Sequence, residues 1–172
     1  MSSEYPMFVN EVCIPSVEAL YQALKFPLQP QIQFEIVKES NAMRAKVISR
    51  SYQEFVRPDW DEIKFEVMEW CLKVKLIQNK ETFGSLLRST KDLPIVEYST
   101  KDNLWGAIPD GEGHLRGVNA LGRLLMKVRS EYILNEKEME YVMAPAITGF
   151  LLFGTKVSKV YSSEYYMEEY LL

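Results

Sequence analysis

The 172-residue chain has few of the residues that build disulfide frameworks and zinc sites: two cysteines, Cys13 and Cys71, and one histidine, His114. Two cysteines are too few for a disulfide framework, and Cys71 falls on the apolar side of a predicted helix, which favours a buried thiol. We expect His114 to stand apart from cysteines and from spaced carboxylates. This argues against a zinc site and against a Ser-His-Asp or Cys-His catalytic unit, so no metal or cofactor is expected, although magnesium held by carboxylates stays open.

Long apolar runs, a basic excess and linkers are also missing. The longest apolar stretch, residues 147–153, is too short to span a bilayer, and the first residues do not resemble a signal peptide, so we expect a cytoplasmic protein with no membrane partner. The net charge of -4 and pI of about 5.2 give no broad basic surface for non-specific nucleic-acid binding. Because 47% of the residues are hydrophobic and no linker divides them, residues 1–172 are predicted to form a single compact domain.

Apolar residues recur at helical spacing along most of the chain, which predicts a mainly α fold with a small β element. The longest predicted helix runs from Trp60 to about Gln78, with Asp59 as N-cap and Glu62 completing a capping box. Shorter helices are predicted over residues 16–25 with Ser16 as N-cap, residues 31–39, residues 42–50 with Asn41 as N-cap, residues 82–87, and from Asn119 onward.

Two further segments complete the prediction of secondary structure. Residues 94–98 are rich in β-branched side chains between breakers, which indicates a strand. Asn135 and Glu138 have the spacing of another capping box. A C-terminal helical extension is therefore predicted over about residues 135–172.

Near the middle of the chain, an acid, an aromatic ring and spaced glycines lead into a predicted helix. Residues 102–106 (DNLWG) precede the glycine-spaced loop 111–117, and Asn119 opens the helix. Such a stretch can provide an aromatic ring that stacks on a base and backbone N–H groups that bind phosphate. Its spacing matches neither of the two best-known phosphate loops, and the glycines and Asn119 could equally serve turns and a cap. Taken alone, this stretch favours the plainer interpretation of turns and a cap over a binding site.

One polar face of the first predicted helix carries Glu18, Gln22 and Lys25 at positions i, i+4 and i+7, so all three side chains can enter one pocket. A solvated helix face has the same pattern. The apolar stripe on the opposite face consists of Val17, Leu20, Tyr21 and Leu24.

Five short motifs follow one another between Tyr5 and about residue 130. They are residues 16–26 (SVEALYQALKF), residues 57–60 (RPDW), Leu87 with Thr90, Val96 and Glu97 with Asp102, Trp105 and Gly106, and residues 117–122 (GVNALG) with Leu125, Met126, Val128 and Arg129. In this order they resemble the NADAR, or YbiA-like, N-glycosidase family. The chain departs from the family at Ala19, where a histidine is usual, and before Tyr5, where the segment is shorter.

The resemblance implies a mainly helical domain that hydrolyses N-glycosidic bonds of phosphorylated ribosides. The family is associated with riboflavin-pathway intermediates and with ADP-ribose attached to guanine, and ADP-ribosylated guanine, free or in nucleic acid, is our first choice. The resemblance further implies that the gene could neighbour an ADP-ribosyltransferase toxin. Cleavage of a riboflavin-pathway intermediate and a non-catalytic ADP-ribose-binding or nucleotide-binding module stay open as alternatives.

Cleavage of a ribosyl C–N bond builds positive charge on the sugar, so the site needs carboxylates near the anomeric carbon. Glu18 and Asp102 are the expected catalytic acids, and Glu97 is a further candidate. Lys25 is the expected nucleophile, because an amine can trap ring-opened ribose as a Schiff base. The amine must be neutral, so burial would have to lower its pKa against the effect of Glu18.

Other residues of the motifs are expected to bind the substrate. Trp60 and Trp105 can stack on bases, whereas Arg57 and Arg129 can bind phosphate or be ordinary surface and helix-end charges. Trp60 could also be a core residue, and Asn119 could both cap its helix and orient it towards the pyrophosphate. The full expected substrate-binding set is Gln22, Arg57, Trp60, Glu97, Trp105, Gly106, Gly117, Asn119 and Arg129.

Overall fold

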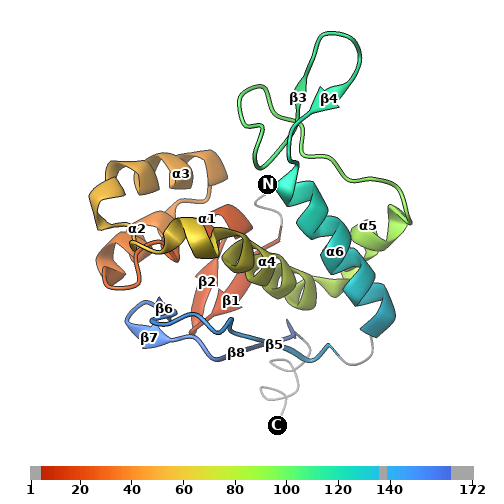
Figure 1. Cartoon of the computed structure of the whole chain (residues 1–172). Helices are drawn as coiled ribbons and strands as arrows, with labels where there is room; N and C mark the ends of the chain where they lie inside the picture. The colour runs from red at the N-terminus through yellow and green to blue at the C-terminus, as the bar shows by residue number, and fades with distance from the viewer. Residues whose placement is uncertain (1–4, 136–138, 164–172) are drawn as a thin grey trace.

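A central helix, α4 (Trp60–Gln78), crosses the molecule, and the other helices pack around it (Figure 1). The computed structural model describes residues 5–135 and 139–163. On one side of α4 lie α1 (Val17–Ala23), α2 (Pro30–Lys38) and α3 (Ala42–Ser51), and on the other lie α5 (Ser85–Ser89) and α6 (Ala120–Asn135). Four two-stranded antiparallel sheets complete the described part, so the mainly α fold with small β elements is confirmed.

Side-chain caps fix the starts of two helices where the sequence predicts them. The Oγ of Ser16 accepts a hydrogen bond from the backbone N–H of Ala19 at 3.1 Å and begins α1. At α3, the Oδ1 of Asn41 accepts from the N–H groups of Met43 and Arg44 at 2.9 and 3.1 Å. Each cap satisfies backbone donors that have no partner within the helix. Because these signals are local, the bounds of both helices agree closely with those predicted.

The predicted bounds of α4 are confirmed, but its predicted capping box is wrong. The Asp59 side chain makes no capping bond, because its carboxylate pairs with Arg57 at 2.6 Å instead. Burial on several sides stabilises the helix, and the Cys71 thiol is fully buried, which raises its pKa. None of the helices in the described ranges combines the length and the apolar character needed to cross a membrane. The buried apolar residues of α4 are Trp60, Val67, Met68, Trp70, Cys71, Leu72, Val74, Leu76 and Ile77.

An N-terminal hairpin that the sequence analysis did not predict packs against α4. It pairs β1 (Met7–Val9) with β2 (Val12–Ile14) through a two-residue turn. Asn10 and Glu11 in that turn both have positive φ, at 48° and 63°, as a tight hairpin turn requires. The strands are only three residues long, too short for a clear alternating pattern that would predict them.

The predicted C-terminal helix is wrong for residues 139–163, which form β-structure below the helices in Figure 1. Here β5 (Tyr141–Met143) pairs with β8 (Lys159–Tyr161), and β6 (Leu151–Leu152) pairs with β7 (Thr155–Lys156). Strands β5 and β8 alternate exposed and buried side chains, a pattern with period two that does not suit a helix. Glu138 of the predicted capping box and residues 164–172 lie outside the described residues.

Residues 94–98 are extended, but the strand predicted there is reduced to a single parallel bridge between Tyr98 and Ala107. The reason is that a side chain takes the place of a partner strand. The amide of Asn119 accepts from the N–H of Glu97 at 3.0 Å and donates to the carbonyl of Ile95 at 2.9 Å. The segment is thereby fastened to the start of α6. Farther along the chain, the helix predicted over residues 82–87 appears as a π-helical turn, Lys80–Gly84, followed by α5.

Candidate functional site

A cavity of about 640 Å³ opens between α1, α3, the first turns of α4 and the loop from residue 97 to residue 106. This volume lies within the range of roughly 300–1,000 Å³ that is typical of small-molecule sites. Its lining includes the motif residues Glu18, Gln22, Lys25, Trp60, Glu97, Asp102, Trp105 and Gly106, together with Tyr21, Met43, Lys46, Arg50, Gln53, Asp61, Lys64, Met68, Tyr98, Ser99, Thr100 and Leu121. The motif residues in the lining therefore come from three separate parts of the sequence.

The polar face of α1 forms one wall of the cavity, as the helical spacing predicts. Glu18 and Gln22 are only 8% and 2% exposed, so the alternative of a solvated face is wrong. The Nε2 of Gln22 donates to the Oε1 of Glu18 at 2.7 Å, which fixes the carboxylate. The Oε1 of Gln22 is buried and accepts no hydrogen bond from the described residues. A buried acceptor without a partner is costly, so a ligand donor is a suitable partner for it.

Lys25 lies on the same wall, and its Nζ is 5.8 Å from the ring centroid of Tyr21 and 5.5 Å from that of Trp60. Burial lowers the pKa of Lys25 to about 8, with Lys46 and Arg50 acting in the same direction and Glu18 opposing them. Burial therefore outweighs the nearby carboxylate, which is the condition that a nucleophilic lysine must meet. A substantial neutral fraction is present near neutral pH.

Aromatic rings surround the amine. Tyr21 lies between Trp60 and Trp105, with ring centroids 4.9 and 5.6 Å away. Tyr21 belongs to the apolar stripe predicted for this helix, but it also lines the cavity. Its hydroxyl makes no hydrogen bond to the part of the chain that the structure describes. Burial raises its pKa, so the hydroxyl keeps its proton at neutral pH. Tyr21 is therefore a hydrogen-bond donor that the sequence interpretation missed.

Asp102 shapes the loop opposite α1. Its Oδ1 accepts from the backbone N–H groups of Leu104 and Trp105 at 3.0 and 2.9 Å, and its own N–H donates to the Oγ of Ser99 at 2.9 Å. These bonds position the Trp105 side chain at the cavity. One carboxylate oxygen is thus used in the loop, and the residue itself lines the cavity, so it can contribute both to loop geometry and to local charge.

Gly106 and Gly117 allow two pieces of backbone to approach closely beside the cavity. A Cβ at Gly106 would lie 2.5 Å from the carbonyl oxygen of Glu97, and one at Gly117 would lie 2.5 Å from the carbonyl oxygen of Gly106. No side chain fits at such distances. Gly106 lines the cavity and Gly117 does not, so Gly117 acts through the packing of the loop.

Besides Gly117, three other predicted substrate-binding residues lie outside the cavity lining. Arg57 pairs with Asp59 through two hydrogen bonds of 2.6 and 2.8 Å and donates to the carbonyl of Thr148. Arg129 is buried and donates to Thr90 Oγ1 at 2.7 Å and to the carbonyl of Leu93 at 2.8 Å. The Asn119 side chain hydrogen-bonds to the backbone of Ile95 and Glu97, as described above. Each of these side chains is occupied in connecting segments of the fold, so their placement does not support phosphate binding.

Basic residues that the sequence analysis did not select line the cavity instead. Lys46 and Arg50 come from α3, and Lys64 comes from α4, where it pairs with Asp61 at 2.8 Å. Their sequence signal is weak, because charges spaced by four residues occur on any solvated helix. The packing of α3 against α1 determines which of these charges faces the cavity.

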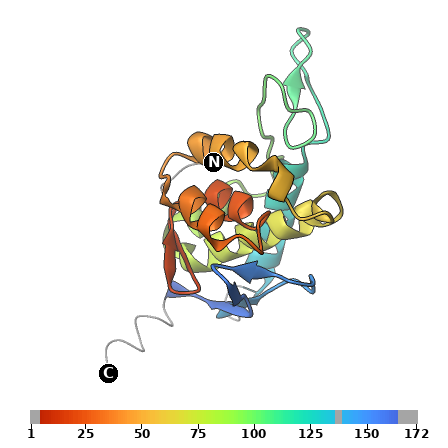
Figure 2. The same cartoon turned by 90° about the vertical axis from the view of Figure 1, so that its left-hand side faces the viewer.

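The glycine-spaced loop is not part of the cavity lining. It forms the hairpin of β3 (Ile108–Pro109) and β4 (Leu115–Arg116), which projects from the body in both views (Figures 1 and 2). Gly111 and Gly113 have φ of 84° and 89°, and a Cβ at either would meet nothing within 4 Å. The two glycines serve the turn, which is the plainer of the two interpretations given above.

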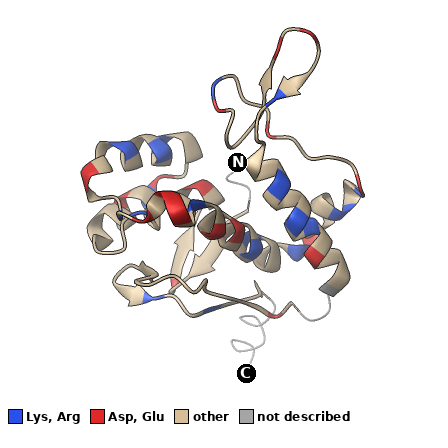
Figure 3. Ribbon diagram, in the orientation of Figure 1, with Lys and Arg blue, Asp and Glu red and all other residues tan. Residues whose placement is uncertain are grey.

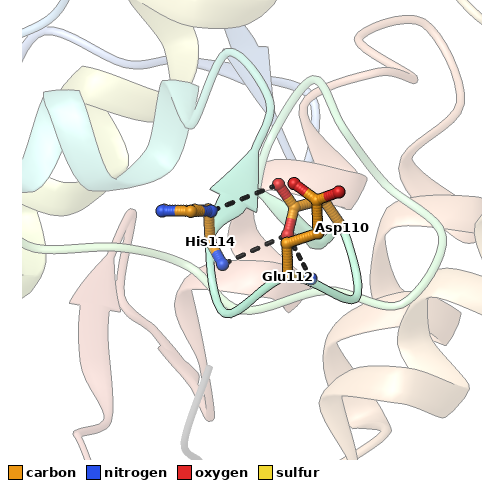
Figure 4. Close-up of side chains that lie close together, drawn as sticks. All are labelled: Asp110, Glu112 and His114. Carbon is orange, nitrogen blue, oxygen red and sulfur yellow. Dashed lines mark hydrogen bonds and ion pairs between the residues drawn. The ribbon is translucent and has the colours of Figure 1, made fainter.

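The hairpin also corrects the expectation that His114 stands apart from carboxylates. Asp110, Glu112 and His114 offer ligand atoms that lie within 4.8 Å of one another (Figure 4). Turn formation accounts for this cluster: Asp110 Oδ1 accepts from the N–H groups of Glu112 and His114 at 2.9 and 3.1 Å, and Oδ2 pairs with Arg116 at 2.9 Å.

Comparison with known proteins identifies the class to which this fold and cavity belong. The NADAR domain family model matches residues 2–132, and the chain belongs to this family. The chain is 33% identical over 132 residues to the protein named N-glycosidase YbiA of Escherichia coli (strain K12), covering 77% of this chain and 79% of that protein. The NMR structure of E. coli YbiA superimposes with a TM-score of 0.66 and 32% identity over 78% of this chain and 76% of that chain.

A second relative is the riboflavin biosynthesis protein VVA0006 of Vibrio vulnificus (strain YJ016), which is 39% identical over 133 residues, or 76% of this chain. The chain spans only about a third, 35%, of the length of that protein. The family match ends within α6, so strands β5 to β8 lie beyond it. The cavity, in contrast, lies entirely within the matched residues.

Proposed function

We propose that this chain is an N-glycosidase that hydrolyses the ribosyl C–N bond of ADP-ribosylated guanine and restores the unmodified base. The observation that carries the proposal is the Lys25 amine, whose pKa is lowered to about 8, beside the buried carboxylate of Glu18 in a cavity of nucleotide size. Relatives named N-glycosidase YbiA support this class of reaction.

The proposed reaction proceeds in two steps. The bond between ribose C1′ and the nitrogen of the base breaks, its electrons leave with the base, and the base takes up a proton. Neutral Lys25 adds to C1′, the C1′–O4′ bond of the ribose ring breaks, and one amine proton passes to O4′, which yields a protonated Schiff base and a free 4′-hydroxyl. Water then attacks C1′, the ribose is released as its hemiacetal, and the amine returns to its starting state. Overall, one water is consumed and one base and one ribosyl product are formed.

Neighbouring groups have complementary roles in this proposal. Glu18, fixed by Gln22, stabilises the positive charge that develops on the sugar, and Asp102 adds to it from the facing loop. The Tyr21 hydroxyl is protonated at neutral pH, so it can donate a hydrogen bond to the departing base. Glu97 also lines the cavity and completes the set of acids expected from the sequence.

Two aromatic rings favour a substrate with two bases. Trp60 and Trp105 both line the cavity and both contact Tyr21, so guanine and adenine can each find a ring on which to stack. The second candidate function is cleavage of a phosphorylated riboflavin-pathway intermediate, which the name of the Vibrio relative favours. A non-catalytic ADP-ribose-binding module is the alternative from another class.

A substrate panel distinguishes these functions. ADP-ribosylated guanosine and a phosphorylated riboflavin-pathway intermediate are incubated separately with the protein, and base release is followed by chromatography. We expect release from ADP-ribosylated guanosine, and a decrease of orders of magnitude in Glu18→Gln with binding retained, because the carboxylate acts mainly in the transition state. Glu81→Gln, an exposed acid outside the cavity lining, is the matched control. Binding of ADP-ribose without any base release would instead support the binding module.

A further inference from the structure

Two cations of α3, Lys46 and Arg50, line the cavity without a counter-ion among the described residues. Neither forms an ion pair or a hydrogen bond with the residues in ranges 5–135 and 139–163. Other basic residues nearby are paired: Arg44 with Glu39 at 3.2 Å and Lys64 with Asp61 at 2.8 Å. An anion from outside the protein is the missing partner of Lys46 and Arg50.

The packing of α3 explains why this pair faces inward. Ala45 and Ser49 are buried, one turn apart, on the face of the helix that packs towards α1. Lys46 and Arg50 each follow by one position, so they lie on one flank of that face, one turn apart. Arg44 lies on the opposite flank and does not line the cavity. Figure 3 shows basic positions along α3 and acidic positions at the start of α4.

The charges of the cavity are distributed unevenly. Its acids come from α1, α4 and the loop around Asp102, whereas the charged groups that α3 contributes to the lining, Lys46 and Arg50, are both basic. Lys46 and Arg50 also lower the pKa of Lys25, so their field reaches the amine. Side chains one helical turn apart have Cβ atoms about 5–6 Å from each other, a spacing that lets both cations contact one phosphate or a diphosphate.

We infer that Lys46 and Arg50 form the phosphate-binding part of the cavity, which holds the phosphate or diphosphate ester of the ribosyl substrate. Arg50 is exposed and Lys46 is half-buried, so the bound phosphate lies at the mouth, while the anomeric carbon reaches Lys25 farther inside. The identity of the ribosyl substrate rests on the proposed function, but the recognition of phosphate does not require catalysis.

Calorimetry with ribose, ribose 5-phosphate and ADP-ribose tests this inference on the whole chain. In Lys46→Gln/Arg50→Gln we expect affinity for both phosphorylated ligands to fall by about 10- to 100-fold, the effect of losing charge-assisted hydrogen bonds. Ribose, which lacks a phosphate, should show no change. Arg44→Gln on the same helix is the matched control and should change affinity by less than about twofold. Thermal melting of each variant verifies that it is folded.

The outcomes separate this inference from the proposed function. Unchanged affinity in the double variant, an equal loss in Arg44→Gln, or native protein that binds neither phosphorylated ligand would overturn it. So would loss of binding confined to an unmodified single-stranded oligonucleotide, which would assign the two cations to a nucleic-acid backbone. If the double variant loses ADP-ribose binding while the native protein releases no base from any substrate, the phosphate-binding part stands and the proposed function fails. If the double variant releases base with an unchanged KM, the proposed function stands and the phosphate-binding part fails.

Discussion

The pKa of Lys25 gives the proposed reaction a defined pH dependence. With a pKa of about 8, about a quarter of the molecules carry a neutral amine at pH 7.5, whereas an ordinary lysine would give about one in a thousand. Since the protonated amine cannot attack, the rate should increase with pH and level off above about pH 8. Between pH 6 and pH 8 the neutral fraction increases about 50-fold. Base release in a single turnover, at a saturating enzyme concentration, measures this rate directly.

Variants of the charged groups around Lys25 provide the control for this pH dependence. Lys46 and Arg50 lower the pKa of Lys25, whereas Glu18 and Asp61 raise it. Lys46→Gln/Arg50→Gln should therefore move the inflection to higher pH when the substrate is saturating. A rate that is constant from pH 6 to pH 9, or an inflection at the ordinary lysine pKa, would refute attack by neutral Lys25.

Four further predictions concern the rest of the site and its support. Tyr21→Phe should lower kcat by about 10²-fold or more with little change in ring packing, as judged by steady-state kinetics and circular dichroism; unchanged kcat would remove Tyr21 as a hydrogen-bond donor to the departing base. Asp102→Asn keeps an acceptor for the loop N–H groups, so it should lower kcat more than it raises KM; a change in KM alone would restrict the residue to loop geometry. Arg129→Met should lower the free energy of unfolding by about 1–3 kcal/mol in denaturant titrations, because buried acceptors lose their donor; an increase in KM at unchanged stability would restore Arg129 as a substrate contact. Base release should persist in excess chelator, since no described residue of the cavity lining is a histidine or cysteine, and a loss that zinc reverses would contradict this.

Local signals account for the parts of the fold that were predicted correctly. Ser16 and Asn41 cap α1 and α3 through bonds to residues two or three positions away, so neighbouring sequence is sufficient to locate both helix starts. The polar face of α1 follows from helical geometry in the same way, since Glu18 and Lys25 need only the period of the helix to share a side. For these reasons the sequence predicted which α1 residues would line one cavity.

The errors arise where distant segments decide the outcome. Arg57 and Arg129 have the chemistry of phosphate-binding residues, but the Thr148 carbonyl and the Thr90–Leu93 segment accept hydrogen bonds from their guanidinium groups. Conversely, Lys46 and Arg50 have the pattern of ordinary surface charges until α3 is packed against α1. Nothing in the local sequence distinguishes the two pairs.

The strands were harder to predict for a different reason. Strands β5 to β8 contain only two or three residues each, and the partner of β5 lies beyond two other strands in the sequence. A two-residue strand has no period that can be measured against a helical one. The strand predicted around Glu97 is reduced to one bridge with Ala107, and the Asn119 side chain takes up the neighbouring backbone groups.

Covalent trapping at Lys25 tests the central claim most directly. Cyanoborohydride added during turnover of ADP-ribosylated guanosine should reduce the Schiff base to a stable amine. Intact mass and peptide mapping should then show a ribosyl-containing adduct on Lys25. Lys25→Arg keeps the positive charge but removes the nucleophile, so this variant should form no adduct and lose turnover. Absence of an adduct on the active native protein, or near-normal turnover of Lys25→Arg, would contradict the account and favour direct attack by water assisted by Glu18 or Asp102.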